Sequence, residues 1–184
     1  MKVYLIRHSE PTYQQVTTAG LTGFGRELGG LTDRGIMLAQ QCAQQPLFAQ
    51  VQLILSSPYT RALQTALEIV RFNDIPLKVE LGLHEWLPDN TGSRTDTDEQ
   101  ATTAYKLYRQ HAGKLYRQHA GKRTTASPLP YESAAEMKAR VLATLNKYAA
   151  SYDCIACVTH GEVMQQFGDQ KDVDYCGVRV IAVN

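Results

Sequence analysis

Histidine and arginine side chains stand directly beyond the apolar runs of this sequence. There are three such places: Arg7 and His8 after residues 3–6, Arg61 shortly after residues 51–55, and His160 after residues 154–158. Two guanidinium groups fit an oxyanion such as phosphate or carboxylate, because the arginine fork matches its oxygens and stays protonated. A neutral imidazole is a good nucleophile toward phosphorus, and a second imidazole can hold the other phosphoryl oxygens. The residue types therefore indicate phosphoryl chemistry.

A carboxyl group completes this set. Glu85 follows a weaker strand pattern at residues 78–81 and lies within the segment Leu-His-Glu-Trp. Such a group can protonate the leaving oxygen of a phosphate ester. Because the arginine and histidine charges can do the neutralising that Mg²⁺ does in kinases, we expect neither a metal nor another cofactor.

Two other functions use part of the same set. His8 and His160 could bind a metal ion together with Glu85 or His84, as in sites with two histidines and one carboxylate. Two arginines in the same place would repel the cation, which disfavours this site. A phosphate- or peptide-binding module without catalysis is the second alternative, and it has no use for a leaving-group acid.

The apolar runs predict the strands that must position these side chains. A continuous apolar run is typical of a strand buried on both faces of a parallel sheet. Open α/β sheets bind their ligands beyond the carboxyl ends of such strands, so one edge of the sheet would collect all five side chains. Cys154 and Cys157 form a C-x-x-C pattern inside one strand, where they point to opposite faces. We interpret both as core residues.

Helical patterns separate the strands. The expected helices are residues 33–45 with Thr32 as N-cap, 58–70 with Ser57 as N-cap, 98–112, and 133–148 opened by a capping box at Ser133 and Glu136. Residues 17–30 are rich in Gly and Thr and predict a mobile loop. Residues 178–183 predict a strand at the edge of the sheet.

Length and composition fit one globular domain over residues 1–184. The net charge of +1 gives no indication of a nucleic acid or a membrane surface as partner. No apolar stretch approaches the ~20 residues that span a bilayer, and no secretory signal is recognised. With four cysteines and no signal, we expect reduced thiols and a cytoplasmic location. The oligomeric state leaves no pattern in the sequence.

Residues 88–130 predict a polar, lid-like excursion from the sheet. Within it, the octapeptide at 106–113 is repeated without change at 114–121, and residues 104–123 carry six cations and no acid. Eight residues rotate the second copy by about 80° on one straight helix, so the copies cannot show the same face. We expect one copy to pack on the body and the other to extend toward the substrate, where its charge could steer anions. A solvated helix face is the alternative.

Six short motifs resemble those of the histidine phosphatase superfamily, the phosphoglycerate mutase-like proteins. In family order they are 7–10 (Arg-His-Ser-Glu, for Arg-His-Gly-Glu), 31–35 (Leu-Thr-Asp-Arg-Gly, for Leu-Thr-x-x-Gly), 56–66 (for Ser-Ser-x-x-x-Arg-Ala-x-Gln-Thr-Ala), 83–86 (the acid-bearing segment), 132–133 (Glu-Ser) and 158–161 (Val-Thr-His-Gly, the second-histidine motif). The resemblance implies a three-layer α/β/α sandwich on a mostly parallel central sheet.

The resemblance also implies a role for each matching residue. His8 would be the nucleophile that becomes phosphohistidine, Arg7 and Arg61 would bind the phosphoryl oxygens, His160 would complete the pocket, and Glu85 would be the acid for the leaving group and then the base for water. Ser9 stands where the family has Gly, so either a strained backbone or a hydroxyl near the phosphate is expected there. Gln14 stands where many members have a phosphate-contacting Asn.

Chain length bears on the choice between hydrolysis and phosphoryl transfer. Mutases of the family are longer and carry inserted segments, so a chain of 184 residues favours a phosphatase that acts on a small-molecule phosphomonoester. A phosphoglycerate mutase-type transfer and a catalytically silent phosphate-binding homologue are the alternatives.

Overall fold

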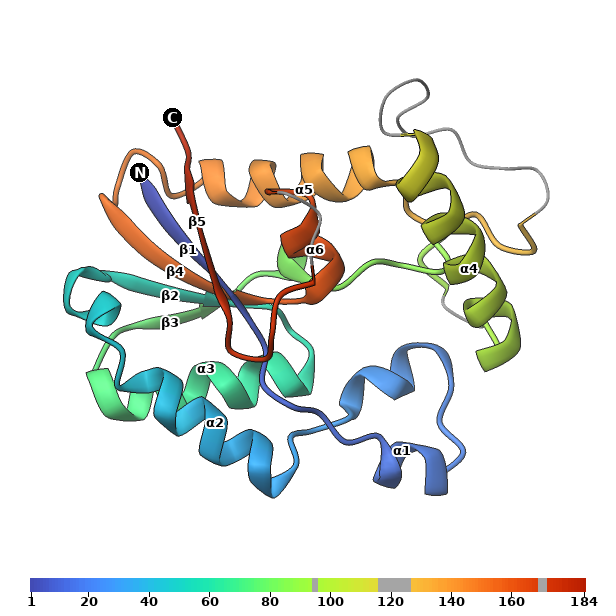
Figure 1. Ribbon diagram of the computed structural model, residues 1–184, viewed down its shortest axis with the longest axis horizontal. Coiled ribbons are helices and arrows are strands. Elements are labelled where there is room, and N and C mark those ends of the chain that lie inside the picture. The colour runs from blue at the N-terminus through green and yellow to red at the C-terminus, as the bar shows by residue number, and fades with distance from the viewer. Residues whose placement is uncertain (94–95, 116–126, 169–171) are drawn as a thin grey trace.

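A five-stranded sheet forms the centre of the computed structural model, which describes residues 1–93, 96–115, 127–168 and 172–184 (Figure 1). The strands are β1 (Lys2–Arg7), β2 (Leu53–Ser56), β3 (Leu77–Val79), β4 (Cys154–Thr159) and β5 (Val178–Ala182), in the order β3-β2-β4-β1-β5. All neighbours pair in parallel except β5, which runs antiparallel to β1 at one edge. The predicted α/β fold with a mostly parallel sheet is therefore confirmed.

Helices cover both faces of the sheet. They are α1 (Gln14–Thr18), α2 (Asp33–Ala43), α3 (Thr60–Asn73), α4 (Asp98–Leu115), α5 (Ala134–Asn146) and α6 (Gly161–Gln165), with 3-10 turns at Gly23–Leu28, Pro46–Gln50 and Leu81–Leu83. In Figure 1, α2 and α3 lie on one face while α5 and α6 lie on the other. None of the described helices is long and apolar enough to cross a membrane.

Alternation along the buried strands supplies both halves of the core. Val3 and Leu5 pack with α5 and α6, whereas Tyr4 and Ile6 pack with α2 and α3. Successive side chains of a strand point to opposite faces, so a strand buried on both faces must be apolar throughout. Cys154 and Cys157 also lie in opposite halves of this core as free, buried thiols, as predicted.

Two helix starts follow the predicted caps and one does not. Thr32 accepts a hydrogen bond from the Gly35 amide, and Ser133 forms the complete capping box with Glu136. The cap predicted at Ser57 is wrong, because α3 begins at Thr60 and Tyr59 occupies the N-cap position. The Ser57 hydroxyl lies instead 2.7 Å from Nε2 of His160.

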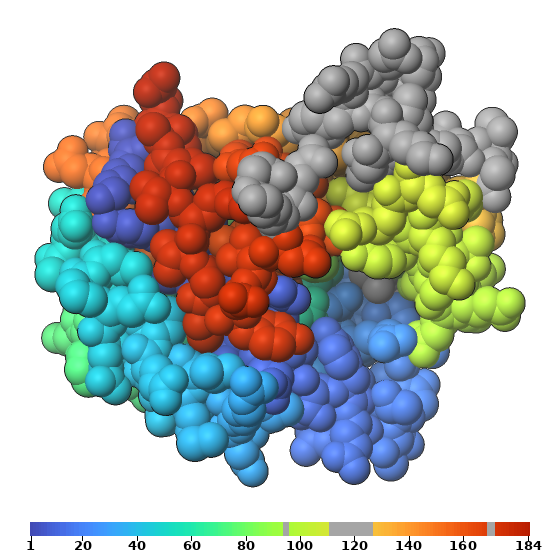
Figure 2. All heavy atoms as spheres, in the orientation of Figure 1, coloured from blue at the N-terminus to red at the C-terminus, as the bar shows by residue number. Residues whose placement is uncertain are grey.

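The segment expected to be a loop at residues 17–30 contains the end of α1 and the 3-10 turn Gly23–Leu28. This turn is joined to α4 by an ion pair of 2.6 Å between Arg26 and Asp98. Figure 2 shows α4, in yellow-green, lying against this blue N-terminal segment. Two parts of the chain that are distant in sequence therefore meet beyond the edge of the sheet.

Helix α4 holds the first copy of the octapeptide. Tyr108 of this copy is buried against Trp86, with ring centroids 5.0 Å apart. The expectation that one copy packs on the body is confirmed for this copy. The second copy, from Tyr116 onward, lies outside the described residues.

Candidate active site

Three parallel strands bring the predicted residues to one edge of the sheet. Arg7 ends β1 and His8 follows it, Arg61 lies in the first turn of the helix after β2, and His160 follows β4. The rings of His8 and His160 meet edge-on, with centroids 5.1 Å apart. Nε of Arg61 donates a hydrogen bond of 3.3 Å to Nε2 of His8. Residues that are more than 150 positions apart in the sequence thus form one cluster.

His8 is buried in its neutral form. Its Nδ1 lies 2.7 Å from the carbonyl oxygen of Ser9, and a carbonyl only accepts, so Nδ1 carries the proton. Nε2 then keeps its lone pair. Burial, and after it the positive charge of Arg61, lowers the pKa of His8 to about 3. The imidazole is therefore neutral, and the lone pair of its Nε2 accepts the hydrogen bond from Nε of Arg61.

Arg7 and Arg61 supply the positive charge beside this atom. Arg7 donates from Nη1 to the carbonyl oxygen of Val173 at 2.5 Å, and its guanidinium lies over the ring of Tyr175. Its buried Nε has no hydrogen-bond partner among the described residues. A donor in this state is satisfied when an oxyanion arrives.

Arg61 holds a carboxylate. Its Nη1 forms an ion pair of 2.7 Å with Glu27 of the 3-10 turn, and the two side chains are only 5% and 18% exposed. Carboxylate and phosphoryl oxygens bind a guanidinium in the same way. Glu27 therefore marks a position on Arg61 that a phosphoryl oxygen can take.

His160 lies behind His8 and is fully buried. Its Nε2 contacts the Ser57 hydroxyl, while Nδ1 has no hydrogen-bond partner within the described part of the chain. Burial, with a further contribution from Arg61, lowers the pKa of His160 well below its usual value. This histidine is therefore neutral and can donate one hydrogen bond to an oxyanion.

The pKa of the Glu85 carboxyl group lies near neutral pH. Its Oε1 accepts from the Trp86 amide at 2.9 Å, and its Oε2 lies 3.5 Å from the Glu162 amide. Burial and, second, the negative charge of Glu162 raise the pKa of Glu85 to about 7. A carboxyl group with this pKa can give and take a proton during turnover.

Glu162 is a residue that the sequence analysis missed. Its carboxylate is buried and accepts hydrogen bonds from the Tyr105 hydroxyl at 2.6 Å and from Nη1 of Arg109 at 3.0 Å. Both partners come from α4, so the excursion contacts the site directly. In the sequence, only its position could have indicated a place in the site, because Glu162 follows His160 and Gly161 directly after β4.

His84, which was considered above as a metal ligand and could also donate a proton, precedes Glu85 in the chain but has different contacts. Its Nδ1 contacts the carbonyl oxygen of Glu85 at 2.6 Å, and its ring lies beside Tyr59. His84 is buried and does not line the cavity, whereas Glu85 does. Within the described ranges, no three His, Cys, Asp or Glu side chains come together to hold a metal ion.

The structure does not bring Ser9 and Gln14 to the cavity in the expected way. The Ser9 hydroxyl donates to the carbonyl oxygen of Gly35 at 2.6 Å, and its amide donates to Oγ1 of Thr65. Its φ is not in the left-handed region, so the backbone is not strained there. Gln14 is exposed at the start of α1, and Tyr13 lines the cavity in its place.

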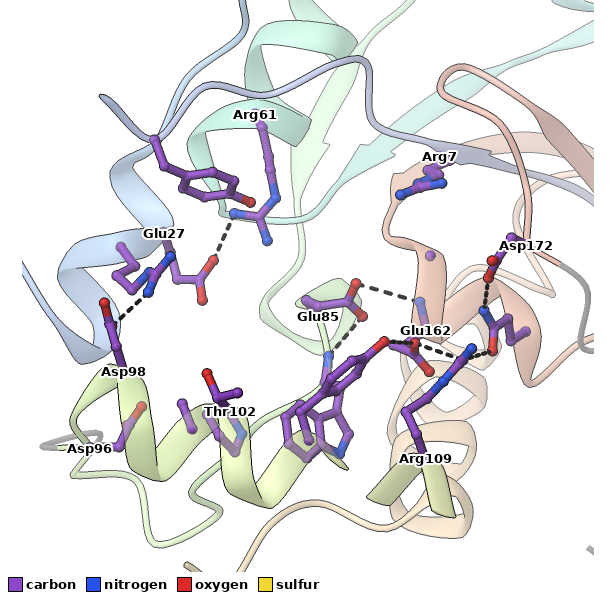
Figure 3. A pocket seen from close by; sticks show the side chains of 18 of the residues that line it. Arg7, Glu27, Arg61, Glu85, Asp96, Asp98, Thr102, Arg109, Glu162 and Asp172 are labelled. Atoms are coloured by element: carbon purple, nitrogen blue, oxygen red, sulfur yellow. Dashed lines mark hydrogen bonds and ion pairs between the residues drawn. The ribbon is translucent and has the colours of Figure 1, made fainter. Parts of the chain in front are cut away.

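A cavity of about 660 Å³ lies in front of this cluster. Its lining includes Arg7, Arg61 and Glu85 together with Trp86, Tyr105 and Asp98, whereas the buried His8 and His160 are not part of it. Figure 3 shows these charged groups pointing into one space from α3, the 3-10 turn, α4 and α6. The volume suits a small organic molecule.

Fold and site together define an α/β protein of the phosphoglycerate mutase-like class, with a histidine pair and two arginines beyond the carboxyl ends of its strands. The family model described as histidine phosphatase superfamily (branch 1) matches residues 3–169, and the chain belongs to this family. Among curated proteins none matches the chain.

Solved structures share the fold at low sequence identity. Bacillus stearothermophilus YhfR is 18% identical, with a TM-score of 0.69, over 100% of this chain and 91% of its own. A mycobacterial glucosyl-3-phosphoglycerate phosphatase is 19% identical, with a TM-score of 0.67, over 97% and 88%. The alpha-ribazole phosphatase from Shigella flexneri is 24% identical, with a TM-score of 0.61, over 100% and 91%.

Proposed function

We propose that this protein is a phosphatase that hydrolyses small-molecule phosphomonoesters through a phosphohistidine on His8. The observation that carries the proposal is the state of His8. Its Nδ1 proton is held by the Ser9 carbonyl, and the lone pair of Nε2 accepts a long hydrogen bond of 3.3 Å from Nε of Arg61, which a bond to phosphorus would replace. A neutral nucleophile next to a fixed cation is what attack on a phosphate dianion requires.

In the first step, Nε2 of His8 attacks phosphorus and the bond between phosphorus and the alcohol oxygen breaks. The electron pair of that bond goes to the leaving oxygen, which takes the proton of the Glu85 carboxyl. Arg7, Arg61 and His160 bind the remaining phosphoryl oxygens. The products are the free alcohol and phosphohistidine.

In the second step, water attacks phosphorus from the side that the alcohol has left. The Glu85 carboxylate takes a proton from this water, and the bond between phosphorus and Nε2 breaks. The electron pair returns to His8, which is again neutral. Since the charges at phosphorus are neutralised by the two arginines, no metal is needed for either step.

Phosphatases among the structural neighbours support hydrolysis as the reaction. These neighbours are named as phosphatases of glucosyl-3-phosphoglycerate and of alpha-ribazole, and a cavity of about 660 Å³ with aromatic residues on its lining accommodates a small organic phosphate ester. Mutase action and a silent binding role are the alternatives, and inorganic phosphate release distinguishes hydrolysis from both. The four free, buried thiols fit a reducing compartment, so we propose a cytoplasmic location.

The test is detection of the covalent intermediate. Rapid quench of the protein with a phosphomonoester should give protein-bound phosphate that is labile in acid and stable in base. His8→Ala should fold normally by circular dichroism, form no such adduct and lose essentially all release of inorganic phosphate. Retention of most of the activity by this variant would show that the nucleophile is another group.

A further inference from the structure

The arginines that line the cavity already have carboxylate partners, with one exception. Arg26 pairs with Asp98 at 2.6 Å, Arg61 with Glu27 at 2.7 Å, and Arg109 with Glu162 at 3.0 Å. Arg7 is the exception among the described residues, since its partners are the Val173 carbonyl and the Tyr175 ring. Figure 3 marks the pair of Arg61 with Glu27 and that of Arg109 with Glu162 by dashed lines.

Acidic groups outnumber cations on the described lining of the cavity. It has four arginines and no lysine, against six carboxylic acids: Glu27, Glu85, Asp96, Asp98, Glu162 and Asp172. Two of the arginines, Arg7 and Arg61, are the ones that the phosphoryl group uses. Glu85 is largely protonated below neutral pH, so the described lining keeps five other acids, three of which are paired with an arginine.

Binding of a phosphoryl group makes the net charge inside the cavity more negative. A phosphoryl oxygen that took the position of Glu27 on Arg61 would bring its negative charge close to the Glu27 carboxylate, which also lines the cavity. A second anionic group on the substrate would then have to separate Arg26 from Asp98 or Arg109 from Glu162. Either separation leaves a carboxylate beside the new anion, and the resulting repulsion is screened by salt because Arg26, Asp98 and Arg109 are 39%, 60% and 43% exposed.

Two aromatic residues of the lining, Trp86 and Tyr105, offer contacts that do not depend on an anionic group. Trp86 and Tyr105 lie edge-on with ring centroids 5.5 Å apart, and both face the cavity. Aromatic faces bind uncharged ring or sugar surfaces and attract cations. Carboxylate oxygens accept hydrogen bonds from hydroxyl groups.

We infer that the substrates of this enzyme are phosphomonoesters whose alcohol carries no second anionic group, so that neutral or cationic alcohols are accepted and carboxylated or bisphosphorylated ones are rejected. This inference rests on the phosphatase function proposed above. It follows from the three occupied arginines and the acidic lining, and it makes a phosphoglycerate a poor substrate.

The sharpest test uses two esters of nearly equal size. Glycerol 3-phosphate and 3-phosphoglycerate differ mainly in a hydroxymethyl group that is replaced by a carboxylate. The wild-type enzyme should show kcat/KM at least about tenfold higher for glycerol 3-phosphate, with a ratio that falls as salt is added. Equal or reversed values would overturn the inference while leaving phosphatase activity intact.

Binding is measured independently of turnover. The same two esters are titrated calorimetrically into His8→Ala, where tighter binding of glycerol 3-phosphate is expected. If wild type hydrolyses neither ester but the variant keeps this preference, the charge selectivity of the cavity is supported, whereas hydrolysis of these two esters is refuted. If the variant prefers 3-phosphoglycerate or does not discriminate, the inference fails.

A matched pair of variants assigns the selectivity to the cavity. Asp98→Asn removes the carboxylate partner of Arg26, so the preference should fall at least about threefold. Glu99→Gln makes the same change of charge one residue further along α4, on an exposed side chain that does not line the cavity, and should keep the wild-type preference. Equal effects of the two changes would contradict a role for the lining and overturn the inference.

Discussion

Glu85 is the residue whose chemistry depends most on its surroundings. Its carboxyl group is removed from water and lies near a second acid, Glu162, whose own carboxylate is held by Tyr105 and Arg109. Arg61 acts in the opposite direction but contributes less. The result is a proton that is present below about pH 7 and is lost above it.

The pH dependence of catalysis follows from this pKa. For an alkyl phosphomonoester, kcat/KM should rise as the substrate loses its second phosphate proton near pH ~6 and fall as Glu85 loses its proton near pH 7. His8 is neutral throughout this range, because its pKa is about 3. Measuring kcat/KM from about pH 4 to about pH 9, in steps of about half a pH unit, tests whether the profile rises and falls in this way.

Two variants test whether the fall of kcat/KM at higher pH is caused by Glu85. Glu85→Gln should remove it and lower kcat/KM for the alkyl ester by about 10²–10⁴-fold, with a smaller loss on p-nitrophenyl phosphate, whose leaving group needs no proton. Glu162→Gln should move this fall of kcat/KM to lower pH, because one cause of the raised pKa is gone. Equal losses on both esters in Glu85→Gln would mean that Glu85 only maintains the shape of the pocket.

At the scale of elements, helix α5 holds the segment that carries Glu85. Arg140 of this helix donates to the carbonyl oxygens of Gly82 and Glu85, at 2.8 and 3.2 Å, and pairs through two nitrogens with the Glu132 carboxylate. A side chain at Gly82 would meet Oγ1 of Thr144 at 2.0 Å, so only glycine allows this close approach. The Glu-Ser motif is thus part of the support for the acid.

Removal of Glu132 should be costly because it leaves Arg140 without its counter-ion. The Glu132 side chain is 3% exposed and that of Arg140 18%, so the pair is largely buried. We expect Glu132→Ala to lower the free energy of unfolding by about 3–5 kcal/mol and to reduce activity on alkyl esters. Urea unfolding measures the first effect.

An exposed ion pair provides the control. Arg71 pairs with Glu68 one turn along α3, and the Arg71 side chain is 70% exposed. Arg71→Ala removes the exposed partner and leaves Glu68 with its hydrogen bond from Gln40, so it should cost no more than about 1 kcal/mol. A similar cost for the two changes would show that the pair of Glu132 and Arg140 does not support the segment with Glu85.

At the scale of the whole molecule, α4 joins the excursion to both the core and the site. Tyr108 packs on Trp86 and Tyr131 of the core, while Arg109 reaches Glu162 in the cavity. Both residues belong to the first copy of the octapeptide. The two copies are identical, so removal of either one produces the same sequence.

Deletion of residues 114–121 should therefore leave the fold and the phosphohistidine intact. The remaining copy provides Tyr108 and Arg109, and shortening a connection changes the free energy of unfolding by about 1 kcal/mol or less. Since two cations are lost, KM should rise at low salt and approach the wild-type value at high salt. Urea unfolding and rapid quench are the measurements, and loss of the adduct would show that the second copy is part of the catalytic structure.

The sequence alone determined the strands of the sheet and the two histidines, two arginines and one glutamate that lie beyond their carboxyl ends. Apolar runs that continue for four or five residues can be buried only within a covered parallel sheet, and the residues after them must then meet at one edge. This rule and the family motifs together predict Arg7, His8, Arg61, His160 and Glu85. The structure brings His8 into contact with Arg61 and His160, and it places Arg7, Arg61 and Glu85 on the lining of one cavity.

Only the tertiary structure decided which other polar groups belong to the site. Ser57 reads as a helix cap in the sequence, but its hydroxyl contacts His160, 103 positions away. No sequence motif marks Glu27 or Glu162, which meet Arg61 and α4 only in the folded protein. The Ser9 hydroxyl contacts the Gly35 carbonyl and Gln14 is exposed, because a side chain's neighbours depend on how elements pack. Local patterns fix the backbone of each strand and helix, whereas contacts between distant segments arise only when the whole core has formed.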